Sequence, residues 1–415
     1  MSLLRVAVLV DLPREAASGG HVKYWERIAQ AAAKEDLPID LTVYFSGAGA
    51  DETLSPRVRF RFLPPVFSTQ RLKFLPYVPA HTDLAPFHPR LAQELPRYDV
   101  IHTTDGFFAF ARTAERIARW NGIPLANSFH TDTPAYAELF TKATLESLFG
   151  CRFGGWLDRF LKISSRQRAG KEKRHRAHLR NCAAVLAMRP EDMALARSVV
   201  AQDKIKPMRL GVDKDLFLPQ TQARAEIERE YRIGAGKFVV LFVGRVDAGK
   251  NMPLLLQVCA EAIAKGVKLH LIVAGLGPMS DEVRVKLKGH VTLVGLVEPQ
   301  KLARLYAAVD CLAIVSDIEI GGMIGLEALA CGCPVLVSRQ SGVAQLCGDT
   351  KAMQAVEGNA AAWVEALTDL AHDTIRQKEM RDAALMFRQD RLAGWADVLN
   401  TDFIPVWQNM AREKT

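Results

Sequence analysis

The stretch SDIEIGGMIGLEALACGCP, residues 316–334, directly follows an apolar run, DCLAIV, at residues 310–315. A short apolar run next to polar and glycine residues is typical of a buried β-strand. The apolar spacing that comes next predicts a helix over about residues 323–331. Gly332 supplies the left-handed residue that commonly ends a helix, and Pro334 prevents the helix from continuing. The segment therefore predicts a strand, a glycine turn and a helix in succession.

The turn between this strand and this helix carries groups that bind ligands. Its two glycines let the backbone approach a ligand closely, and the unpaired N–H groups at the start of the helix bind anions such as phosphate. Glu319 precedes this position and Glu327 follows it. Because carboxylates bind sugar hydroxyls, a glutamate on each side of an anion site indicates a ligand with phosphate between two sugars. A nucleotide sugar has this layout, and its ribose would meet one of the glutamates.

A second region places two cations after another predicted strand. The segment VGRVDAGKN, residues 243–251, puts Arg245 and Lys250 in a glycine-containing loop beyond the end of the strand. Two cations in such a loop suit a diphosphate, and they would stabilise the charge that grows on a diphosphate leaving group. The segment VAGLGP, residues 273–278, adds a further turn after a strand, with Gly275 at its start.

Strand-like and helix-like stretches alternate along the chain, which indicates α/β domains with parallel sheets. A chain of 415 residues is long for one hydrophobic core, and turn signals with a charged helix at residues 205–235 indicate a join between two domains. We therefore predict two Rossmann-like, doubly wound domains that face each other across a cleft lined by strand ends. The predicted strands are residues 4–10, 40–45, 99–102, 124–130, 183–187, 237–245, 268–275, 290–295, 310–315 and 333–338.

Composition excludes several classes of protein. A hydrophobic content of 49% and a charged content of 24% are ordinary for a soluble globular chain. Seven cysteines without metal-ligand spacing indicate free thiols in a reducing compartment. No apolar run approaches the ~18 residues that a membrane span needs. The start, MSLLRVAVLVDLP, is typical of a first strand and not of a signal peptide.

Together these motifs resemble the donor domain of the retaining glycosyltransferases of family four, which have the GT-B fold. The resemblance covers most of residues 205–350 and rests on the spacing of the two glutamates, on GRVDAGKN, on VAGLGP and on RLGVDKDLF at residues 209–217. This chain has Gly321-Gly322 where the family usually has Phe-Gly, so the identity of the donor sugar stays open. The resemblance implies an enzyme that needs no metal and no cofactor.

The resemblance also implies roles for individual residues of the second domain. Glu319 would hold hydroxyls of the donor sugar, and Glu327 would hold the ribose. Arg245 and Lys250 would hold the diphosphate. The other donor-binding residues that it implies are Gly275 and the backbone at Gly322, Met323 and Ile324.

The first domain matches the family less sharply. Gly19 and Gly20, after the first strand, fit the glycine loop that approaches the donor phosphates. His130, in NSFHTDTP, matches a family histidine near the reacting sugar, and Asp132 is an acceptor-side candidate by its position. The implied catalytic residues are His130, Glu319, Arg245 and Lys250, without a covalent nucleophile.

A basic aromatic segment bears on the acceptor. Residues 151–180 contain ten Lys or Arg and two acidic residues. The net charge of this segment is therefore +8, equal to that of the whole chain. An aromatic stripe at helical spacing with basic neighbours is typical of a helix at a membrane interface, but it is also typical of core packing, and both interpretations stay open. A second basic aromatic stretch lies at residues 57–79. The stripe is Phe149, Phe153, Trp156, Phe160 and Ile163, flanked by Arg152, Arg159 and Arg166.

We therefore predict an acceptor-side domain over residues 1–205, with the basic amphipathic segment at 149–180, a donor domain over 206–385, and a C-terminal helix within 386–415 that crosses back to the first domain. The predicted activity is retaining transfer of a sugar from a nucleotide sugar, with UDP favoured over GDP, to a lipid, a lipid-linked sugar or an envelope glycan. The predicted location is the cytoplasm, and peripheral attachment to the inner face of the cytoplasmic membrane stays open.

Two other functions stay open at this point. The first is a soluble enzyme of the same fold that acts on a small sugar or sugar phosphate, or a phosphorylase. The second is a nucleic-acid binder, which only the basic run favours. No nucleic-acid-binding fold surrounds that run, so we expect no nucleic-acid partner.

Overall fold

The computed structural model describes residues 3–15, 18–35, 37–69, 83–317, 322–348 and 350–413. The chain forms two compact units. Unit 1 comprises Met1–Arg209 with Trp395–Thr415, and unit 2 comprises Leu210–Gly394. The predicted domain boundaries are 205/206 and 385/386, whereas the two units divide after Arg209 and after Gly394.

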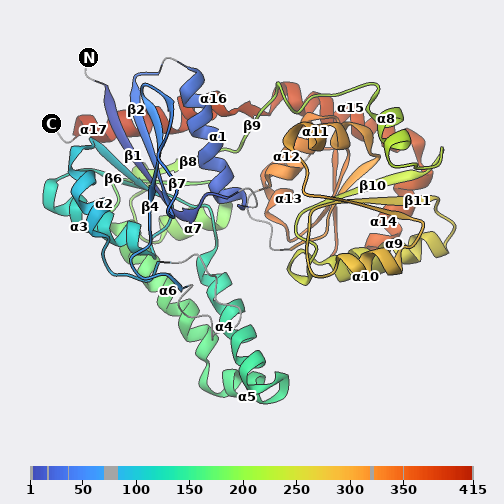
Figure 1. Cartoon of the computed structure of the whole chain (residues 1–415), viewed down its shortest axis with the longest axis horizontal. Helices are drawn as coiled ribbons and strands as arrows, with labels where there is room; N and C mark the ends of the chain where they lie inside the picture. Colours follow the sequence, from blue (N-terminus) through green and yellow to red (C-terminus); the bar gives the residue numbers. More distant parts are fainter. Residues whose placement is uncertain are drawn as a thin grey trace. The chain divides into compact units, whose positions relative to one another are not determined.

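Unit 1 contains an eight-stranded sheet with the order β3-β4-β2-β1-β5-β6-β7-β8, parallel except for β3 (Figure 1). Buried aliphatic and aromatic side chains of α2, α3 and the sheet form its core. Its strands are β1 Leu4–Pro13, β2 Ile39–Ser46, β3 Glu52–Ser55, β4 Val58–Leu63, β5 Val100–Thr103, β6 Leu125–Ser128, β7 Ala184–Ala187 and β8 Ile205–Pro207. Its helices are α1 Gly20–Lys34, α2 Pro89–Glu94, α3 Ala109–Asn121, α4 Thr133–Phe149, α5 Cys151–Leu161, α6 Ile163–Arg180, α7 Pro190–Arg197, α16 Trp395–Val398 and α17 Ile404–Glu413.

Unit 2 contains a six-stranded parallel sheet with the order β12-β11-β10-β13-β14-β15. Its core surrounds the buried Trp363 of α14 and the apolar face of α9. Its strands are β10 Phe238–Val243, β11 Leu269–Ala274, β12 Val291–Gly295, β13 Cys311–Ile314, β14 Val335–Ser338 and β15 Met353–Val356, with a short pair of β9 Gly211–Val212 and β16 Ala393–Gly394. Its helices are α8 Ala223–Glu230, α9 Met252–Ala264, α10 Ser280–Lys286, α11 Pro299–Ala308, α12 Met323–Ala330, α13 Gly342–Cys347, α14 Ala360–His372 and α15 Thr374–Asp390.

The sheet orders confirm the doubly wound α/β fold class. All ten predicted strands are present, with ends that differ by at most a few residues. The strand pattern succeeds because buried parallel strands are short, continuous apolar runs. Edge elements such as β3 and β8 lack that signal and were not predicted.

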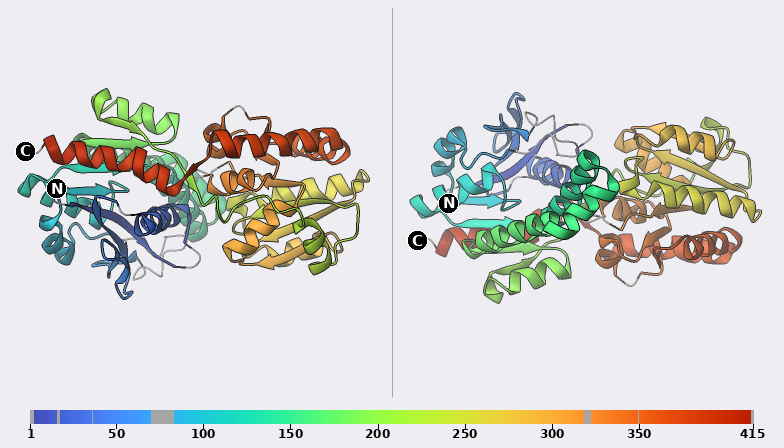
Figure 2. Two further views of the ribbon diagram at one scale, coloured as in Figure 1. Left: turned by 90° about the horizontal axis from the view of Figure 1, so that it is seen from above. Right: turned by 90° about the horizontal axis from the view of Figure 1, so that it is seen from below.

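The last residues of the chain belong to unit 1. A π-helical turn at Leu399–Phe403 joins α16 to α17, and α17 packs against β1 and β5 (Figure 2). Trp407 of α17 is fully buried, and Asp402 forms an ion pair with Arg209 at 2.6 Å. Residue 386 lies inside α15 of unit 2, so the segment that returns to unit 1 starts later than the sequence indicated.

The basic aromatic segment does not form one continuous helix, so the prediction that a single helix carries the stripe from Phe149 to Ile163 is wrong. The helix breaks at Gly150, with φ of 81°, and at Lys162, with φ of 53°, which are left-handed conformations. The three resulting helices α4, α5 and α6 extend away from the sheet of unit 1 (Figure 1). Gly154 allows the close packing of α5 on α4, because a Cβ there would lie 2.4 Å from the carbonyl oxygen of Leu145.

The membrane-interface interpretation of residues 57–79 is wrong for residues 58–63. Residues 58–63 form β4, whose Phe60 is fully buried in unit 1, so this portion cannot lie at a membrane interface. Residues 70–79 lie outside the described part of the chain. Within the described ranges, no helix combines the length and the apolar run that crossing a bilayer requires.

Candidate functional site

The described residues of unit 2 that are predicted to bind the donor follow strands at the carboxyl edge of its sheet. The first strand of this sheet, β10, lies between β11 and β13. The chain therefore winds away from β10 in both directions, and the strand order reverses between β10 and β13. Arg245 and Lys250 follow β10, and the residues before α12 follow β13. This position is where doubly wound sheets bind their ligands.

One carboxylate organises the loop that carries the two cations. The Asp247 carboxylate accepts a hydrogen bond from the backbone N–H of Lys250 at 3.0 Å. The same carboxylate pairs with the guanidinium of Arg245 at 2.6 Å, although the Arg245 side chain is 77% exposed. The loop is therefore held in shape while the Arg245 cation stays accessible to an anionic ligand.

The cation loop is tied to the start of the α12 region. Asn251 is left-handed, with φ of 56°, and its side-chain N–H donates to the carbonyl of Val315 at 3.2 Å. Val315 directly follows β13, and α12 begins eight residues later at Met323. The hydrogen bond therefore ties the loop of Lys250 to the end of β13, the strand that precedes α12 in the chain.

Gly322 and α12 adopt the predicted turn and helix. Gly322 is the residue before the first turn of α12, and a Cβ on it would lie 2.9 Å from Cγ2 of Val343. The first N–H groups of a helix have no acceptor within the helix, so the amides of Met323 and Ile324 are available for an anion. Glu319 lies outside the described residues, so its role stays a prediction.

Glu327 lies one turn into α12 and is oriented by a residue that sequence reasoning missed. The hydroxyl of Tyr306, on α11, donates to Oε2 of Glu327 at 3.4 Å. Tyr306 is fully buried, and burial together with the nearby Glu327 raises its pKa well above the ordinary range, so it stays a neutral donor. A tyrosine in an apolar helical pattern is indistinguishable in sequence from a core residue.

Gly275 has a structural role that its sequence context did not reveal. Its φ is 148°, and a Cβ on it would lie 1.8 Å from the carbonyl oxygen of Gly244 in the cation loop. Next to it, Val246 N–H donates to the carbonyl of Leu276 at 3.0 Å. Gly275 therefore lets the loops after β10 and β11 pair closely, and its contact with a donor stays a prediction.

We expect the Gly275→Ala variant to lower the free energy of unfolding of unit 2 by at least about 3 kcal/mol, because the Cβ collides with backbone that cannot move without breaking the loop pair. Urea unfolding followed by tryptophan fluorescence measures this change. Gly289→Ala is the matched control: its φ is 79° but nothing lies within 4 Å of the added Cβ, so only about 1 kcal/mol is expected. Equal losses in both variants would contradict the collision.

The predicted residues of unit 1 meet at the carboxyl edge of its own sheet. Gly19 caps α1 after β1, and a Cβ on it would meet nothing within 4 Å. His21, directly after Gly20, stacks on His130 with ring centroids 4.6 Å apart. The structure therefore brings the glycine turn and His130 together, with His21 as a further residue between them.

Two tryptophans fix the tautomers of the buried histidines. The indole N–H of Trp25 donates to Nε2 of His130 at 3.1 Å, and that of Trp407 donates to Nδ1 of His102 at 3.0 Å. An indole N–H can only donate, so both ring nitrogens are acceptors. Ser128 Oγ lies 2.8 Å from His102 Nε2 and 2.8 Å from His130 Nε2.

The direction of this chain of hydrogen bonds follows from those two donors. Burial lowers the pKa of His102 to about 3, so this ring is neutral and carries its proton on Nε2, which donates to Ser128. The Ser128 hydroxyl then donates to His130. Burial, and then the neighbouring His21 and His102, lower the pKa of His130 well below its ordinary value. His130 is therefore a neutral imidazole with its proton on Nδ1.

His21 leaves a polar atom without a partner at this edge. Burial lowers its pKa to about 3, and among the described residues its Nε2 is buried and makes no hydrogen bond. Buried polar atoms rarely stay unsatisfied, and those that do are often found where a ligand binds. The atom lies in the residue that follows Gly19 and Gly20.

The predicted acceptor-side residues are not gathered in one place. Asp132 caps α4, accepting a hydrogen bond from the N–H of Ala135 at 3.0 Å. Phe153, Trp156, Arg159 and Phe160 instead lie on α5, where all four are exposed. The rings of Phe149, Phe153, Trp156 and Phe160 form a continuous series with centroid separations of 6.2, 5.7 and 5.5 Å. They do not pack in a core, which removes one of the two interpretations of the stripe.

Comparison with known proteins agrees with this geometry. Residues 223–386 match the family model described as glycosyl transferases group 1. The D-inositol 3-phosphate glycosyltransferase of Arthrobacter sp. (strain FB24) is 25% identical over 323 residues, which are 74% of this chain and 70% of that protein. Several other curated relatives are matched over less than half of their own length.

Solved structures share the fold over the whole chain. Anabaena Alr3699/HepE in complex with UDP and glucose has a TM-score of 0.66 at 15% identity, with 99% of both chains covered. WaaG, described as a glycosyltransferase involved in lipopolysaccharide biosynthesis, has a TM-score of 0.62 at 16% identity, also with 99% of both chains covered. This likeness confirms the predicted GT-B fold.

Proposed function

We propose that this protein, a glycosyltransferase of group 1 by its domain at residues 223–386, moves a sugar from a nucleoside diphosphate sugar to a lipid, a lipid-linked sugar or an envelope glycan with retention of configuration. The observation that carries the proposal is the hydrogen bond from Asn251 to Val315, which joins the Arg245–Lys250 loop to the end of β13, the strand before α12. The donor we favour is a UDP-sugar. HepE, which shares the fold, is described as a complex with UDP and glucose.

The described residues provide what a diphosphate leaving group requires. Arg245 and Lys250 supply positive charge, and the first amides of α12 supply fixed donors at the same edge. Preorganised donors of this kind stabilise charge that develops in the transition state. Side-chain cations at this position make a bound metal ion unnecessary for neutralising the diphosphate. We assign the ribose hydroxyls to Glu327, which Tyr306 orients.

The remaining assignments follow the family resemblance. Glu319 holds hydroxyls of the donor sugar, Gly19 and Gly20 approach the phosphates, and the Nδ1–H of His130 donates a hydrogen bond to an oxygen of the donor or acceptor. The acceptor hydroxyl attacks the anomeric carbon from the face that the diphosphate vacates, and its proton passes to the leaving phosphate. The new glycosidic bond forms as the bond to the diphosphate breaks, so configuration is retained.

The exposed rings of α5 support a membrane-bound acceptor. Phe153 and Trp156 are each 54% exposed, and Phe160 is 71% exposed. Arg159, Lys162 and Arg166, on α5, its end and α6, are exposed nearby, which suits an anionic lipid surface. WaaG, which shares the fold, is described as involved in lipopolysaccharide biosynthesis.

We expect the Trp156→Glu/Phe160→Glu variant to bind anionic vesicles at least about thirtyfold more weakly, because each ring contributes about 2 kcal/mol on burial. Co-sedimentation with phosphatidylglycerol vesicles measures the change. Trp120→Glu is the matched control, because Trp120 is 66% exposed on α3, away from the ring series. This variant should bind vesicles as the unaltered protein does. Equal binding by both variants would favour a soluble acceptor.

A further inference from the structure

A second charged groove lies in unit 1, at the sheet edge opposite to His130. Its volume is about 830 Å³, and its walls come from α3, the end of α6 and the end of α17. Residues Pro124, Leu125 and Ala183 line it, at the amino ends of β6 and β7. Gly19 and His130 instead follow the carboxyl ends of β1 and β6. The groove is therefore separate from the sugar-transfer residues of this unit.

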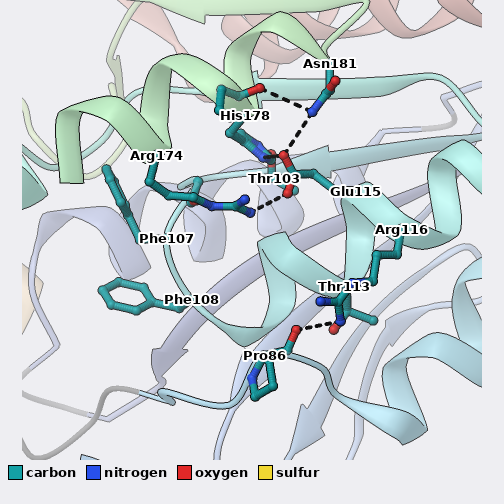
Figure 3. A network of polar contacts seen from close by, with 12 residues as sticks. Pro86, Thr103, Phe107, Phe108, Thr113, Glu115, Arg116, Arg174, His178 and Asn181 are labelled. Atoms are coloured by element: carbon teal, nitrogen blue, oxygen red, sulfur yellow. Dashed lines mark hydrogen bonds and ion pairs between the residues drawn. The ribbon is translucent and has the colours of Figure 1, made fainter. Parts of the chain in front are cut away.

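Four arginines line this groove. Arg112, Arg116 and Arg119 lie on one face of α3, at spacings of four and three residues, and Arg174 comes from α6. Arg116 donates to the carbonyl of Pro86 at 2.9 Å, which is a neutral acceptor (Figure 3). Burial lowers the pKa of Arg112, and the adjacent Arg174 and Arg116 lower it further. The guanidinium groups are thus close enough to repel one another.

The nearest carboxylate already serves two cations. Glu115 pairs with Arg174 and lies 3.2 Å from Nδ1 of His178 (Figure 3). Asn181 also donates to Glu115 at 3.2 Å. Burial opposes the charged form of the fully buried His178, but the contacts with Cys182 and Glu115 prevail and raise its pKa to about 10. Glu115 therefore balances only one of the two cations that contact it.

The groove consequently carries an excess of positive charge. Among the described residues that line it, the carboxylates are Glu115 and Glu413. Four arginines face these two carboxylates, so the described lining of the groove carries an excess of two positive charges. Lys171 and Asp105, which also act on Arg112, have opposite charges and cancel each other. A folded chain tolerates such an excess best where an anion binds.

We propose that this groove binds a soluble small molecule that carries two or more phosphoryl groups. The planar guanidinium fork matches phosphoryl oxygens in two-point contacts. Arg112 and Arg119 are about 10 Å apart along the axis of α3, which exceeds the span of a single phosphate. The volume is within the range of about 300–1,000 Å³ that is typical of small-molecule sites. The proposal does not depend on the sugar-transfer activity.

The test is calorimetric titration of the full chain with inorganic pyrophosphate. The Arg245→Ala/Lys250→Ala background removes the cation pair of unit 2, so binding there does not interfere. We expect Arg112→Gln/Arg116→Gln to weaken pyrophosphate binding at least tenfold. The matched control, Arg90→Gln/Arg180→Gln, removes two exposed arginines of unit 1 outside the groove and should change the affinity less than twofold.

Three outcomes would overturn the proposal. The first is pyrophosphate binding that both double variants leave unchanged. The second is orthophosphate binding as tightly as pyrophosphate, which would exclude recognition of more than one phosphoryl group. The third is binding to cardiolipin vesicles that depends on Arg112 and Arg116 while pyrophosphate does not bind, which would place the phosphoryl groups on a lipid. Circular dichroism of each variant confirms that it is folded.

Discussion

Replacing both Arg245 and Lys250 by alanine lowers kcat/KM for the nucleotide sugar by at least about a thousandfold, because removing one preorganised donor to developing charge typically costs 10²–10³. The loss falls mainly on kcat, since the diphosphate carries most charge in the transition state. Release of the nucleoside diphosphate, followed with a coupled assay, measures both constants.

The control variant also removes one arginine and one lysine from unit 2, but at a place away from the predicted diphosphate site. Arg284 and Lys286 lie on α10 of the same unit, where both are exposed and pair with neighbouring acids of their own helix. The Arg284→Ala/Lys286→Ala variant should retain kcat/KM within about twofold, as surface pairs contribute little. If the first variant also retained kcat/KM within tenfold, Arg245 and Lys250 would not hold the diphosphate.

Replacing Trp25 by phenylalanine and Ser128 by alanine together lowers kcat by roughly tenfold to a hundredfold while KM changes little. Outer partners that orient a functional histidine are typically worth this amount. Both residues donate to Nε2 of His130, so that nitrogen cannot carry a proton while they are present. Without both of them, Nε2 can be protonated and the Nδ1–H donor is no longer the only form, whereas either one alone still holds Nε2 as an acceptor.

The pH dependence distinguishes this role from a merely structural one. Burial, and then His21 and His102, lower the pKa of His130 well below its ordinary value, so kcat of the unaltered protein should stay flat across mildly acidic pH. In the double variant the pKa rises, because the two donors that stabilise the neutral ring are absent, and kcat should then fall on the acidic side. Nitrogen chemical shifts of the ring, measured by NMR, report the tautomer independently of activity.

Trp395→Phe serves as the control for Trp25→Phe. Trp395 lies in the same aromatic group, with its ring 5.1 Å from that of Tyr24, and it is buried to a similar degree. It should preserve both the tautomer of His130 and the flat pH profile. A new acidic limb in Trp395→Phe, or none in Trp25→Phe/Ser128→Ala, would contradict the directional hydrogen bonds.

The groups that contact a ligand were easier to predict from sequence than the groups that orient them. Arg245, Lys250 and Gly322 stand directly after predicted strands, and the edge of a parallel sheet fixes where such residues lie. Tyr306 and Trp407 have no such signal, because their roles arise from contacts with residues far away in the sequence. Trp407 is 305 positions from His102, to which it donates.

The roles of two glycines were also only partly predictable from the sequence. Gly275 and Gly322 both follow predicted strands, and both were assigned to the ligand. The structure gives Gly275 a packing contact with Gly244 and gives Gly322 one with Val343. Sequence identifies where the backbone must come close to something, but only the fold shows whether that is a ligand or another loop.

The breaks in the basic aromatic segment also depend on the fold. Helical spacing alone continues through Gly150 and Lys162, because each residue is compatible with a helix in isolation. Packing of α5 on α4 at Gly154 requires the chain to reverse direction, and the left-handed residues at the two breaks make that possible. The periodicity therefore predicted the aromatic face correctly but wrongly predicted one continuous helix beneath it.

The most direct test of the central claim is a donor panel. Full-length protein is incubated with UDP- and GDP-sugars, with and without anionic vesicles, and release of the nucleoside diphosphate is measured. We predict release from a UDP-sugar that increases with vesicles and is lost in Arg245→Ala/Lys250→Ala. Neither binding nor turnover of any nucleotide sugar by the unaltered protein would contradict the assignment of this edge as a nucleotide-sugar site.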